Sequence, residues 1–219
     1  VSGVLVGLDH MPSAAVPAIS PALGAALASV LEPAAIALDN ARAIQRAEAV
    51  SVTDDLTGLY NSRYLSLVLR RESKRASRSG RPLSLLFLDL DGFKQVNDTH
   101  GHLAGSRALV EAAGIIRGTA RETDVAARFG GDEFSVVLPD TGGEGAISVA
   151  ERIRDRINAC AFLASQGLQV HLTASIGVAT LPDVAASAEE LLRAADEAMY
   201  RVKDGGKNGI YVAQDVNVF

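Results

Sequence analysis

Cysteine is almost absent from this sequence, since Cys160 is the only one among 219 residues. A single cysteine excludes an internal disulfide and a multi-cysteine zinc site, and it is consistent with a reducing cytoplasm, where we expect the protein to work. Basic residues are outnumbered too, with 21 Lys and Arg against 26 Asp and Glu. The net charge of −5 argues against nucleic-acid polymers and anionic membranes as partners. We expect any phosphate-bearing ligand to be small and held by local cations.

Charge is scarcest between residues 13 and 38, where Glu32 is the only charged residue. A stretch of this length raises the question of a transmembrane helix. Three prolines, Pro17, Pro21 and Pro33, are expected to break it, and it is rich in alanine rather than leucine. We predict that the stretch does not enter a membrane.

The first residues form a piece of their own. The chain starts at Val1, and residues 4–8 are a short apolar stretch typical of a strand, so we expect a fragment of a larger protein. Pro33 suits a first helical turn, and residues 34–52 are good helix formers without Gly or Pro. One helical face is apolar, with Asn40 in its seam, which favours a short parallel coiled coil; one side of a helix folded onto its own chain is the alternative. That face consists of Ile36, Ala43, Ala47 and Val50.

Two glycines, Gly130 and Gly131, are followed by the carboxylates Asp132 and Glu133. Apolar segments on both sides of this stretch predict a hairpin that reverses at the glycines. Glycine lets a large ligand lie against the backbone, and carboxylates beside it suit a hard cation that prefers oxygen ligands. The pattern indicates a platform for a nucleotide and magnesium. The stretch alone leaves an ordinary hairpin with solvated acids as the alternative.

A second acidic stretch favours the metal site. Residues 83–91 are a nearly continuous apolar run, as in a strand buried on both faces, and the run ends in carboxylates. If Asp89 and Asp132 approach to about 4 Å, their repulsion is on the order of 4 kcal/mol at an effective dielectric constant of about 20. A divalent cation removes that cost.

Further motifs extend the pattern over residues 53–213. They are Asp54–Asn61, Asp89–Asp98, Gly101–His102, Arg128–Phe134, Ser175–Ala179 and Ala195–Asn208. In this order they resemble the GGDEF domain of the nucleotide cyclases, of which the diguanylate cyclases are the main class. The resemblance implies an α/β (α+β) fold with a central, mostly antiparallel sheet flanked by helices, similar to the palm of polymerases and to adenylyl cyclases. The order of the expected strands and helices agrees with it.

The resemblance places a GGDEF cyclase domain at residues 53–219. Residues 1–52 more weakly resemble the C-terminal remnant of a GAF sensor domain that continues into a linker helix. Too little of a GAF domain remains to hold a ligand pocket.

The same resemblance implies roles for the site residues. The metal, Mg²⁺ or Mn²⁺, would be bound by Asp89, Asp132 and the backbone carbonyl of Leu90. The phosphates would be bound by Lys94, Lys203 and Lys207. The residues expected to contact the rest of the nucleotide are Phe93, Asn97, Ser106, Gly130 and Gly131. Phosphoryl transfer depends on positioning and on neutralising charge at phosphorus, which metal and lysines supply. We count Lys94, Asp132 and Glu133 as catalytic. Glu133 would accept the proton of a 3′-hydroxyl or orient a second metal.

Base recognition departs from the family pattern. In most diguanylate cyclases a Gly-His-x-x-Gly motif is followed by an aspartate, which accepts hydrogen bonds from guanine beside an asparagine that matches Asn97. Here Ser106 takes the place of the aspartate. A hydroxyl donates or accepts, whereas a carboxylate would face the N1 lone pair of adenine. Relieving one mispaired buried group is worth about 1–3 kcal/mol.

A serine at the position of Ser106 resembles the hybrid promiscuous branch of GGDEF enzymes. These enzymes accept ATP as well as GTP and make cyclic GMP-AMP as well as cyclic di-GMP. We favour this branch. A strict diguanylate cyclase, in which Ser106 merely caps a helix from Arg107 onward, is the alternative.

Arg121 and Asp124 form an Arg-x-x-Asp motif that resembles the family's product-inhibition site, with Arg152 as a secondary arginine. The resemblance implies that the cyclic dinucleotide product binds there. It also implies a homodimer, because each domain binds one GTP or ATP and two half-sites must face each other. A degenerate module that only binds cyclic dinucleotide is a further alternative, against which the retained acids and glycines argue.

Overall fold

The computed structural model describes residues 20–214, with residues 42–50 described by their backbone alone. Contacts divide the chain into two units, residues 1–51 and residues 52–219. The strand expected at residues 4–8 lies outside the described residues, so the resemblance to a GAF remnant stays a prediction.

The described part of the first unit is helix α1 (Pro21–Val50), which contradicts the expectation that Pro21 and Pro33 break this stretch; Pro17 lies outside the described residues. Pro21 occupies the first turn, where no N–H is needed. Pro33 lies inside the helix, so the helix does not start there as expected. Its missing N–H removes the one hydrogen bond to the carbonyl of Ser29, and the helix continues through it.

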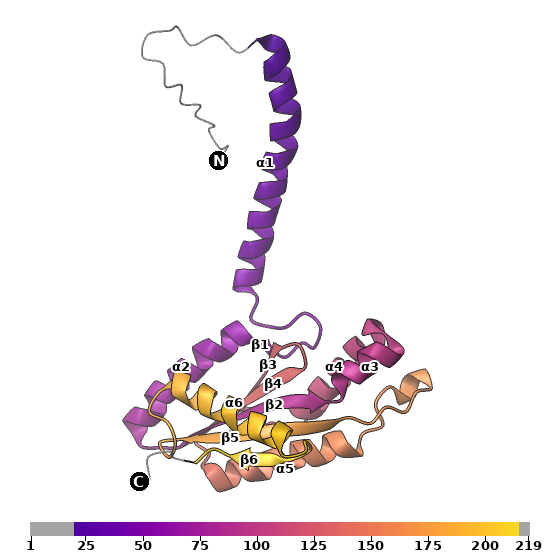
Figure 1. The fold of residues 1–219 in the computed structure, drawn as a ribbon. Coiled ribbons are helices and arrows are strands. Elements are labelled where there is room, and N and C mark those ends of the chain that lie inside the picture. The colour runs from indigo at the N-terminus through magenta and orange to yellow at the C-terminus, as the bar shows by residue number, and fades with distance from the viewer. Residues whose placement is uncertain (1–19, 215–219) are drawn as a thin grey trace. The chain divides into compact units, whose positions relative to one another are not determined.

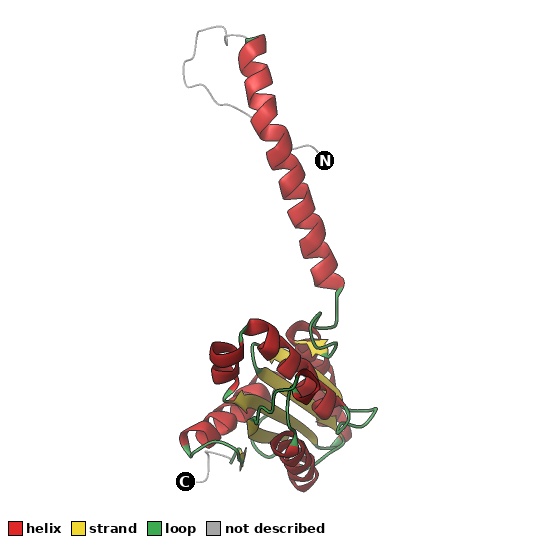
Figure 2. Ribbon diagram, turned by 90° about the vertical axis from the view of Figure 1, so that its right-hand side faces the viewer, coloured by secondary structure: helices red, strands yellow, loops and turns green. Residues whose placement is uncertain are grey.

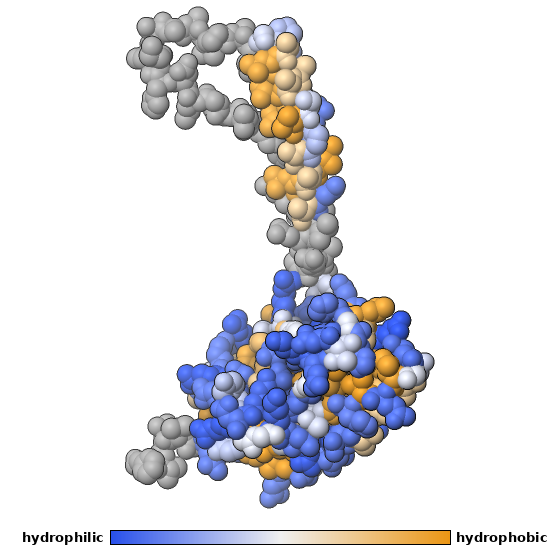
Figure 3. All heavy atoms as spheres, turned by 45° about the vertical axis from the view of Figure 1, so that its right-hand side comes forward, coloured by the Kyte–Doolittle hydropathy of each residue, from blue (hydrophilic) through white to orange (hydrophobic). Residues whose placement is uncertain are grey.

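Apolar side chains are exposed along α1 (Figure 3). Residues 21–41 have a mean hydropathy of 1.6 and none of them is buried, so the helix is long and apolar enough to cross a membrane by length and composition alone. Absence from a membrane remains a prediction. Of the expected coiled-coil face only Ile36 has a described side chain, and it is 62% exposed.

The second unit is built on one six-stranded sheet with the order β1-β3-β4-β2-β5-β6 (Figure 1). The central strand β2 pairs antiparallel with β4 and β5, and β3 pairs antiparallel with β4, whereas the short outer strands run parallel to their neighbours. Every residue of β2 is buried, which confirms the expected doubly buried strand. The strands are β1 (Tyr60–Asn61), β2 (Leu83–Asp91), β3 (Val125–Gly130), β4 (Glu133–Pro139), β5 (Thr173–Leu181) and β6 (Ile210–Val212).

Helices cover both faces of this sheet because both faces are apolar (Figure 2). One face packs α2 and α6 over Leu85 and Phe87, and the other packs α3, α4 and α5 over Leu86 and Leu88. The helices are α2 (Ser62–Ser79), α3 (Phe93–His100), α4 (His102–Arg117), α5 (Gly143–Ala159) and α6 (Ala188–Asp204), with a 3-10 turn at Ala164–Gln166. This architecture confirms the predicted fold class.

One helix boundary bears on the site. Helix α4 begins at His102 with Gly101 as its N-cap, so Ser106 lies inside the helix and the expectation that it caps a helix from Arg107 is wrong. The hydroxyl of Ser106 is therefore not needed at the helix end.

Candidate nucleotide site

The two acidic stretches meet on neighbouring strands. In the register of β2 and β4, Asp89 faces Glu133, and the N–H of Leu90 donates to the carbonyl of Asp132 at 3.2 Å. Backbone hydrogen bonds therefore bring Asp89 and Asp132 together, although they are distant in the sequence.

Burial makes the carboxylates of Asp89 and Glu133 costly to ionise. Asp89 is 6% exposed, and burial raises the pKa of its carboxyl, to which the charge of Asp132 adds. Burial and the neighbouring carboxylates also raise the pKa of Glu133. The Nζ atom of Lys203 lies 2.7 Å from Oδ2 of Asp89 and offsets part of the repulsion.

This donor set fits a hard divalent cation. Asp89, Asp132 and the carbonyl of Leu90 offer oxygen atoms, which Mg²⁺ and Mn²⁺ prefer. The ammonium group of Lys203 is paired with Asp89, which shows that this carboxylate attracts a cation. Among residues 20–214 no three His, Cys, Asp or Glu side chains form a metal-binding group. Asp89, Asp132 and the carbonyl oxygen of Leu90 are therefore the ligands that the protein would offer a metal here.

A cavity of about 440 Å³ lies beside the acids. The expected phosphate ligands line it from three places: Lys94 from the start of α3, Lys203 from the end of α6 and Lys207 from the loop that follows α6. Phe93 forms part of its wall. Lys94 and Lys207 are exposed, so their charges are available to an anionic ligand.

Asn97 and Ser106 lie at the junction of α3 and α4. A Cβ on Gly105 would lie 2.0 Å from Oδ1 of Asn97 and 3.3 Å from the ring of Phe93, so the glycine makes room for both side chains. The amide of Asn97 thus packs against the residue that directly precedes Ser106.

The tip of the glycine hairpin is open. Gly131 has a φ of 52°, which favours glycine, and no atom lies within 4 Å of a Cβ built on Gly130 or Gly131. A ligand therefore has access to the backbone at this point.

Arg128 ties the hairpin to a turn at residues 54–58. Its Nη2 and Nε donate to the carbonyl of Gly131 at 2.7 and 3.0 Å, and its Nη1 donates to both carboxylate oxygens of Asp54 at 3.2 Å. Asp54 also accepts from the N–H and hydroxyl of Thr57. Burial opposes ionisation, but these bonds lower the pKa of Asp54 below its ordinary value. Sequence reasoning gave Arg128 and Asp54 no role.

Asp91 is a second residue whose role the sequence did not reveal. It is 7% exposed, and its carboxylate accepts from the hydroxyls of Thr173 and Ser175 at 2.8 Å and from the N–H of Asn208 at 3.0 Å. Asp91 therefore joins the end of β2 to β5 and to the loop that carries Lys207.

Arg121 and Asp124, expected at a product site, follow α4 and line a cavity of about 310 Å³. Oδ2 of Asp124 accepts from the backbone N–H of Arg121 at 2.8 Å. Arg152 lies on α5 and is exposed, but it is not part of this cavity wall.

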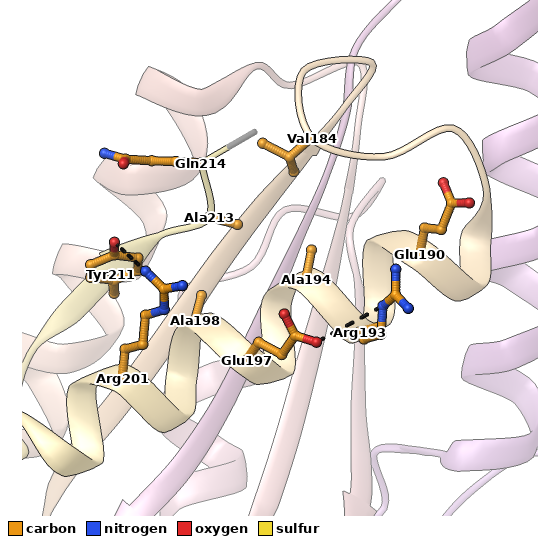
Figure 4. A pocket seen from close by; sticks show the side chains of 10 residues that line it. All are labelled: Val184, Glu190, Arg193, Ala194, Glu197, Ala198, Arg201, Tyr211, Ala213 and Gln214. Carbon is orange, nitrogen blue, oxygen red and sulfur yellow. Dashed lines mark hydrogen bonds and ion pairs between the residues drawn. The ribbon is translucent and has the colours of Figure 1, made fainter. Parts of the chain in front are cut away.

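Another hollow, between α6 and the end of the chain, contains none of the expected site residues (Figure 4). Its charged side chains have partners of their own: Arg193 pairs with Glu197 at 3.9 Å, Arg201 donates to the hydroxyl of Tyr211 at 2.9 Å, and Glu190 accepts from the N–H of Ala186 at 2.8 Å. The acidic cavity at β2 is therefore the better candidate.

Comparison with known proteins identifies the family. Residues 51–209 match the model described as the GGDEF domain of diguanylate cyclases. The chain belongs to the GGDEF family. The response regulator PleD of Caulobacter vibrioides is 40% identical to this GGDEF chain over 162 residues, which are 74% of the chain and 36% of PleD. The probable diguanylate cyclase DgcC of Escherichia coli is 38% identical over 169 residues, or 77% of the chain and 45% of DgcC. The GGDEF chain thus spans less than half the length of these relatives.

Solved GGDEF domains have the same fold. The domain of TpbB (YfiN) from Pseudomonas aeruginosa matches with a TM-score of 0.70 and 38% identity, covering 74% of this chain and 94% of that one. The domain of DgcB from Caulobacter crescentus, solved in complex with c-di-GMP, matches with a TM-score of 0.70 and 30% identity, covering 74% and 96%.

Proposed function

We propose that this GGDEF domain condenses two nucleoside triphosphates into a 3′,3′-cyclic dinucleotide. The observation that carries the proposal is the meeting of Asp89 and Asp132 beside a cavity lined by three lysines. Each 3′-oxygen attacks the α-phosphorus of the other nucleotide, and the bond to the leaving pyrophosphate breaks, so that two pyrophosphates are released. The relatives named as diguanylate cyclases support this reaction class.

The metal, Mg²⁺ or Mn²⁺, would be held by Asp89, Asp132 and the carbonyl of Leu90. When bound, it supplies positive charge against the negative charge that develops during phosphoryl transfer. The lysines of the cavity would bind the phosphates, and the open glycine tip would accept the nucleotide backbone. Glu133 suits the proton acceptor for the 3′-hydroxyl, since a carboxyl whose pKa is raised is a stronger base.

Pyrophosphate release tests this function. With GTP and Mg²⁺ we expect the wild-type protein to release pyrophosphate and Asp132→Asn to lose about a hundredfold or more in rate, because one oxygen ligand and one charge are removed. A wild-type protein that binds cyclic di-GMP without releasing pyrophosphate would instead be a binding module.

Ser106 supports a finer proposal, the use of ATP beside GTP to give cyclic GMP-AMP as well as cyclic di-GMP. A hydroxyl at position 106 tolerates either purine, whereas a carboxylate there selects guanine. A strict diguanylate cyclase fits the named relatives equally well, and the product decides between the two.

Incubation with equimolar ATP and GTP, followed by chromatographic separation of the products, makes that decision. We expect the wild type to make cyclic GMP-AMP as well as cyclic di-GMP. For Ser106→Asp we expect the ratio of cyclic di-GMP to cyclic GMP-AMP to rise about ten- to a hundredfold. Cyclic di-GMP alone from the wild type would establish the strict cyclase.

The cavity at Arg121 and Asp124 supports product inhibition as a further part of the function. The guanidinium group of Arg121 would hold phosphate there while the carboxylate of Asp124 accepts from guanine. We expect Arg121→Ala to retain turnover at high concentrations of cyclic di-GMP that inhibit the wild type; equal inhibition of both would contradict the assignment.

A further inference from the structure

The cavity at Arg121 and Asp124 extends to the turn that begins the second unit. Leu59 and Tyr60 form an apolar and aromatic part of its wall, and Arg117, at the end of α4, lines it as a second arginine. An aromatic residue, two guanidinium groups and one carboxylate match the chemistry of a purine nucleotide, which offers a ring to stack, phosphates to bind and N–H groups to accept from.

Arg117 is already engaged by that turn. Its Nη2 donates a hydrogen bond to the carbonyl of Gly58. Gly58 has a φ of 65°, and its N–H donates to the carbonyl of Asp54 at 2.8 Å. The guanidinium group of Arg117 therefore holds the turn at residues 54–58 against the end of α4.

The other side of the same turn is held by Arg128. Because Arg128 bonds both to Asp54 and to the carbonyl of Gly131, a continuous path of hydrogen bonds leads from Arg117 through Gly58, Asp54 and Arg128 to the tip of the glycine hairpin. A change at Arg117 thus has a physical route to the catalytic hairpin.

We propose that Arg117 is a further phosphate ligand in the product cavity, and that a bound cyclic dinucleotide draws it away from Gly58 and thereby loosens the turn and the glycine hairpin. The inference rests on the proposed product site at Arg121 and Asp124. A phosphate is a stronger acceptor than a neutral carbonyl for a guanidinium donor, so the exchange is favourable. In the proposed exchange Arg117 gives up its bond to Gly58 when the ligand binds, so the ligand discriminates between the two arrangements, as a shift of equilibrium requires.

Calorimetric titration with cyclic di-GMP tests the ligand. We expect Arg117→Ala to raise the Kd about tenfold or more, and Arg117→Lys to recover part of the affinity. Arg78→Ala, which removes an exposed arginine of α2, serves as the control and should leave the Kd unchanged. A Kd for Arg117→Ala within about twofold of wild type overturns the inference.

Arg121→Ala separates this failure from that of the proposed function. If Arg121→Ala loses cyclic di-GMP binding while Arg117→Ala retains it, only the proposed role of Arg117 is wrong. If the wild type does not bind cyclic di-GMP, or Arg121→Ala binds it as well as wild type, the product site itself falls.

Hydrogen exchange on the wild type tests the route without any substitution. When cyclic di-GMP is added, we expect faster amide exchange at Gly58, whose N–H donates to the carbonyl of Asp54, and in the glycine hairpin. Unchanged or slower exchange at both places overturns the proposed route.

Discussion

At the scale of single residues, the site balances buried carboxylates against one internal cation. The Nζ atom of Lys203 lies 2.7 Å from Oδ2 of Asp89. Burial lowers the pKa of Lys203, but the hydrogen bond to Asp89 and the charge of that carboxylate raise it further, so the net pKa is raised and the lysine stays protonated at neutral pH. The ammonium group of Lys203 forms an ion pair with a carboxylate that would also be a ligand of the proposed metal. Lys203 and the metal therefore compete for Asp89 until phosphates offer the lysine another partner.

Replacement of Lys203 tests this competition. In nucleotide-free protein we expect Lys203→Met to bind Mn²⁺ about five- to tenfold more tightly, on the order of 1 kcal/mol, because a competing cation is removed. Electron paramagnetic resonance of free Mn²⁺ measures the affinity. Lys94→Met is the matched control, since Lys94 makes no ion pair within residues 20–214. Both variants should slow pyrophosphate release, and weaker Mn²⁺ binding by Lys203→Met would contradict the competition.

Asp91 gives a second prediction at this scale. In Asp91→Asn an amide NH₂ group replaces one acceptor oxygen, so a donor such as the N–H of Asn208 loses its partner and the loop with Lys207 shifts. We expect the KM for GTP to rise about tenfold, in line with one lost hydrogen bond to a charged group, and kcat to change less. Asp183→Asn, an exposed aspartate, is the control. An unchanged KM would show that Asp91 does not position the loop.

The residues that were predicted and those that were missed differ in how their roles are encoded. Asp89 and Asp132 could be predicted because each stands at the end of a recognisable apolar strand within a local motif. Asp91 and Arg128 stand in the same motifs, but their partners, Asn208 and Asp54, come from segments remote in the sequence. Only the folded sheet and its turns bring those partners together.

At the scale of elements, the contact between β5 and α6 determines where the lysines lie. A Cβ on Gly177 would lie 1.9 Å from the carbonyl oxygen of Ala195 and 2.4 Å from the backbone nitrogen of Met199. The strand and the helix thus touch backbone to backbone at this glycine. Lys203 lies at the end of the same helix, so its position depends on this contact.

Substitution of two glycines tests the contact. We expect Gly177→Ala to lower the free energy of unfolding by about 3 kcal/mol or more, because the backbone of α6 must move. Gly114→Ala is the matched control: its added Cβ meets nothing within 4 Å, and alanine favours an exposed helix position by about 1 kcal/mol. Urea denaturation measures both. A Gly177→Ala protein as stable as wild type would rule out the close packing.

Element boundaries were harder to predict than element types. The apolar run of β2 specified its strand, because burial on both faces leaves no polar position. Proline was a poor guide to α1, since one missing hydrogen bond at Pro33 does not end a helix of 30 residues. Ser106 resembled a cap by residue type, but the helix begins at His102, and that start depends on the packing of α3 and α4.

At the scale of the whole molecule, the described part of the chain brings together one pair of candidate metal ligands, Asp89 and Asp132, beside one glycine hairpin, whereas a cyclic dinucleotide needs two nucleotides activated at once. Two chains must therefore face each other in the proposed reaction. When monomers predominate, the dimer fraction is proportional to total protein, so we expect about a twofold loss of specific activity for each twofold dilution. Specific activity independent of concentration down to the lowest measurable protein level would show a preformed, tight dimer or a competent single chain.

A mixing experiment separates those two cases. In a pair of wild type with Asp132→Asn, only one half-site has both metal acids, so one 3′-oxygen attack proceeds and the second fails. Excess Asp132→Asn should therefore lower cyclic product and cause a linear dinucleotide with a 5′-triphosphate to accumulate, as chromatography would detect. The same excess of an unrelated protein controls for crowding. If cyclic product per wild-type chain is unaffected after the chains have had time to exchange, each chain closes the ring alone and the half-site mechanism is wrong.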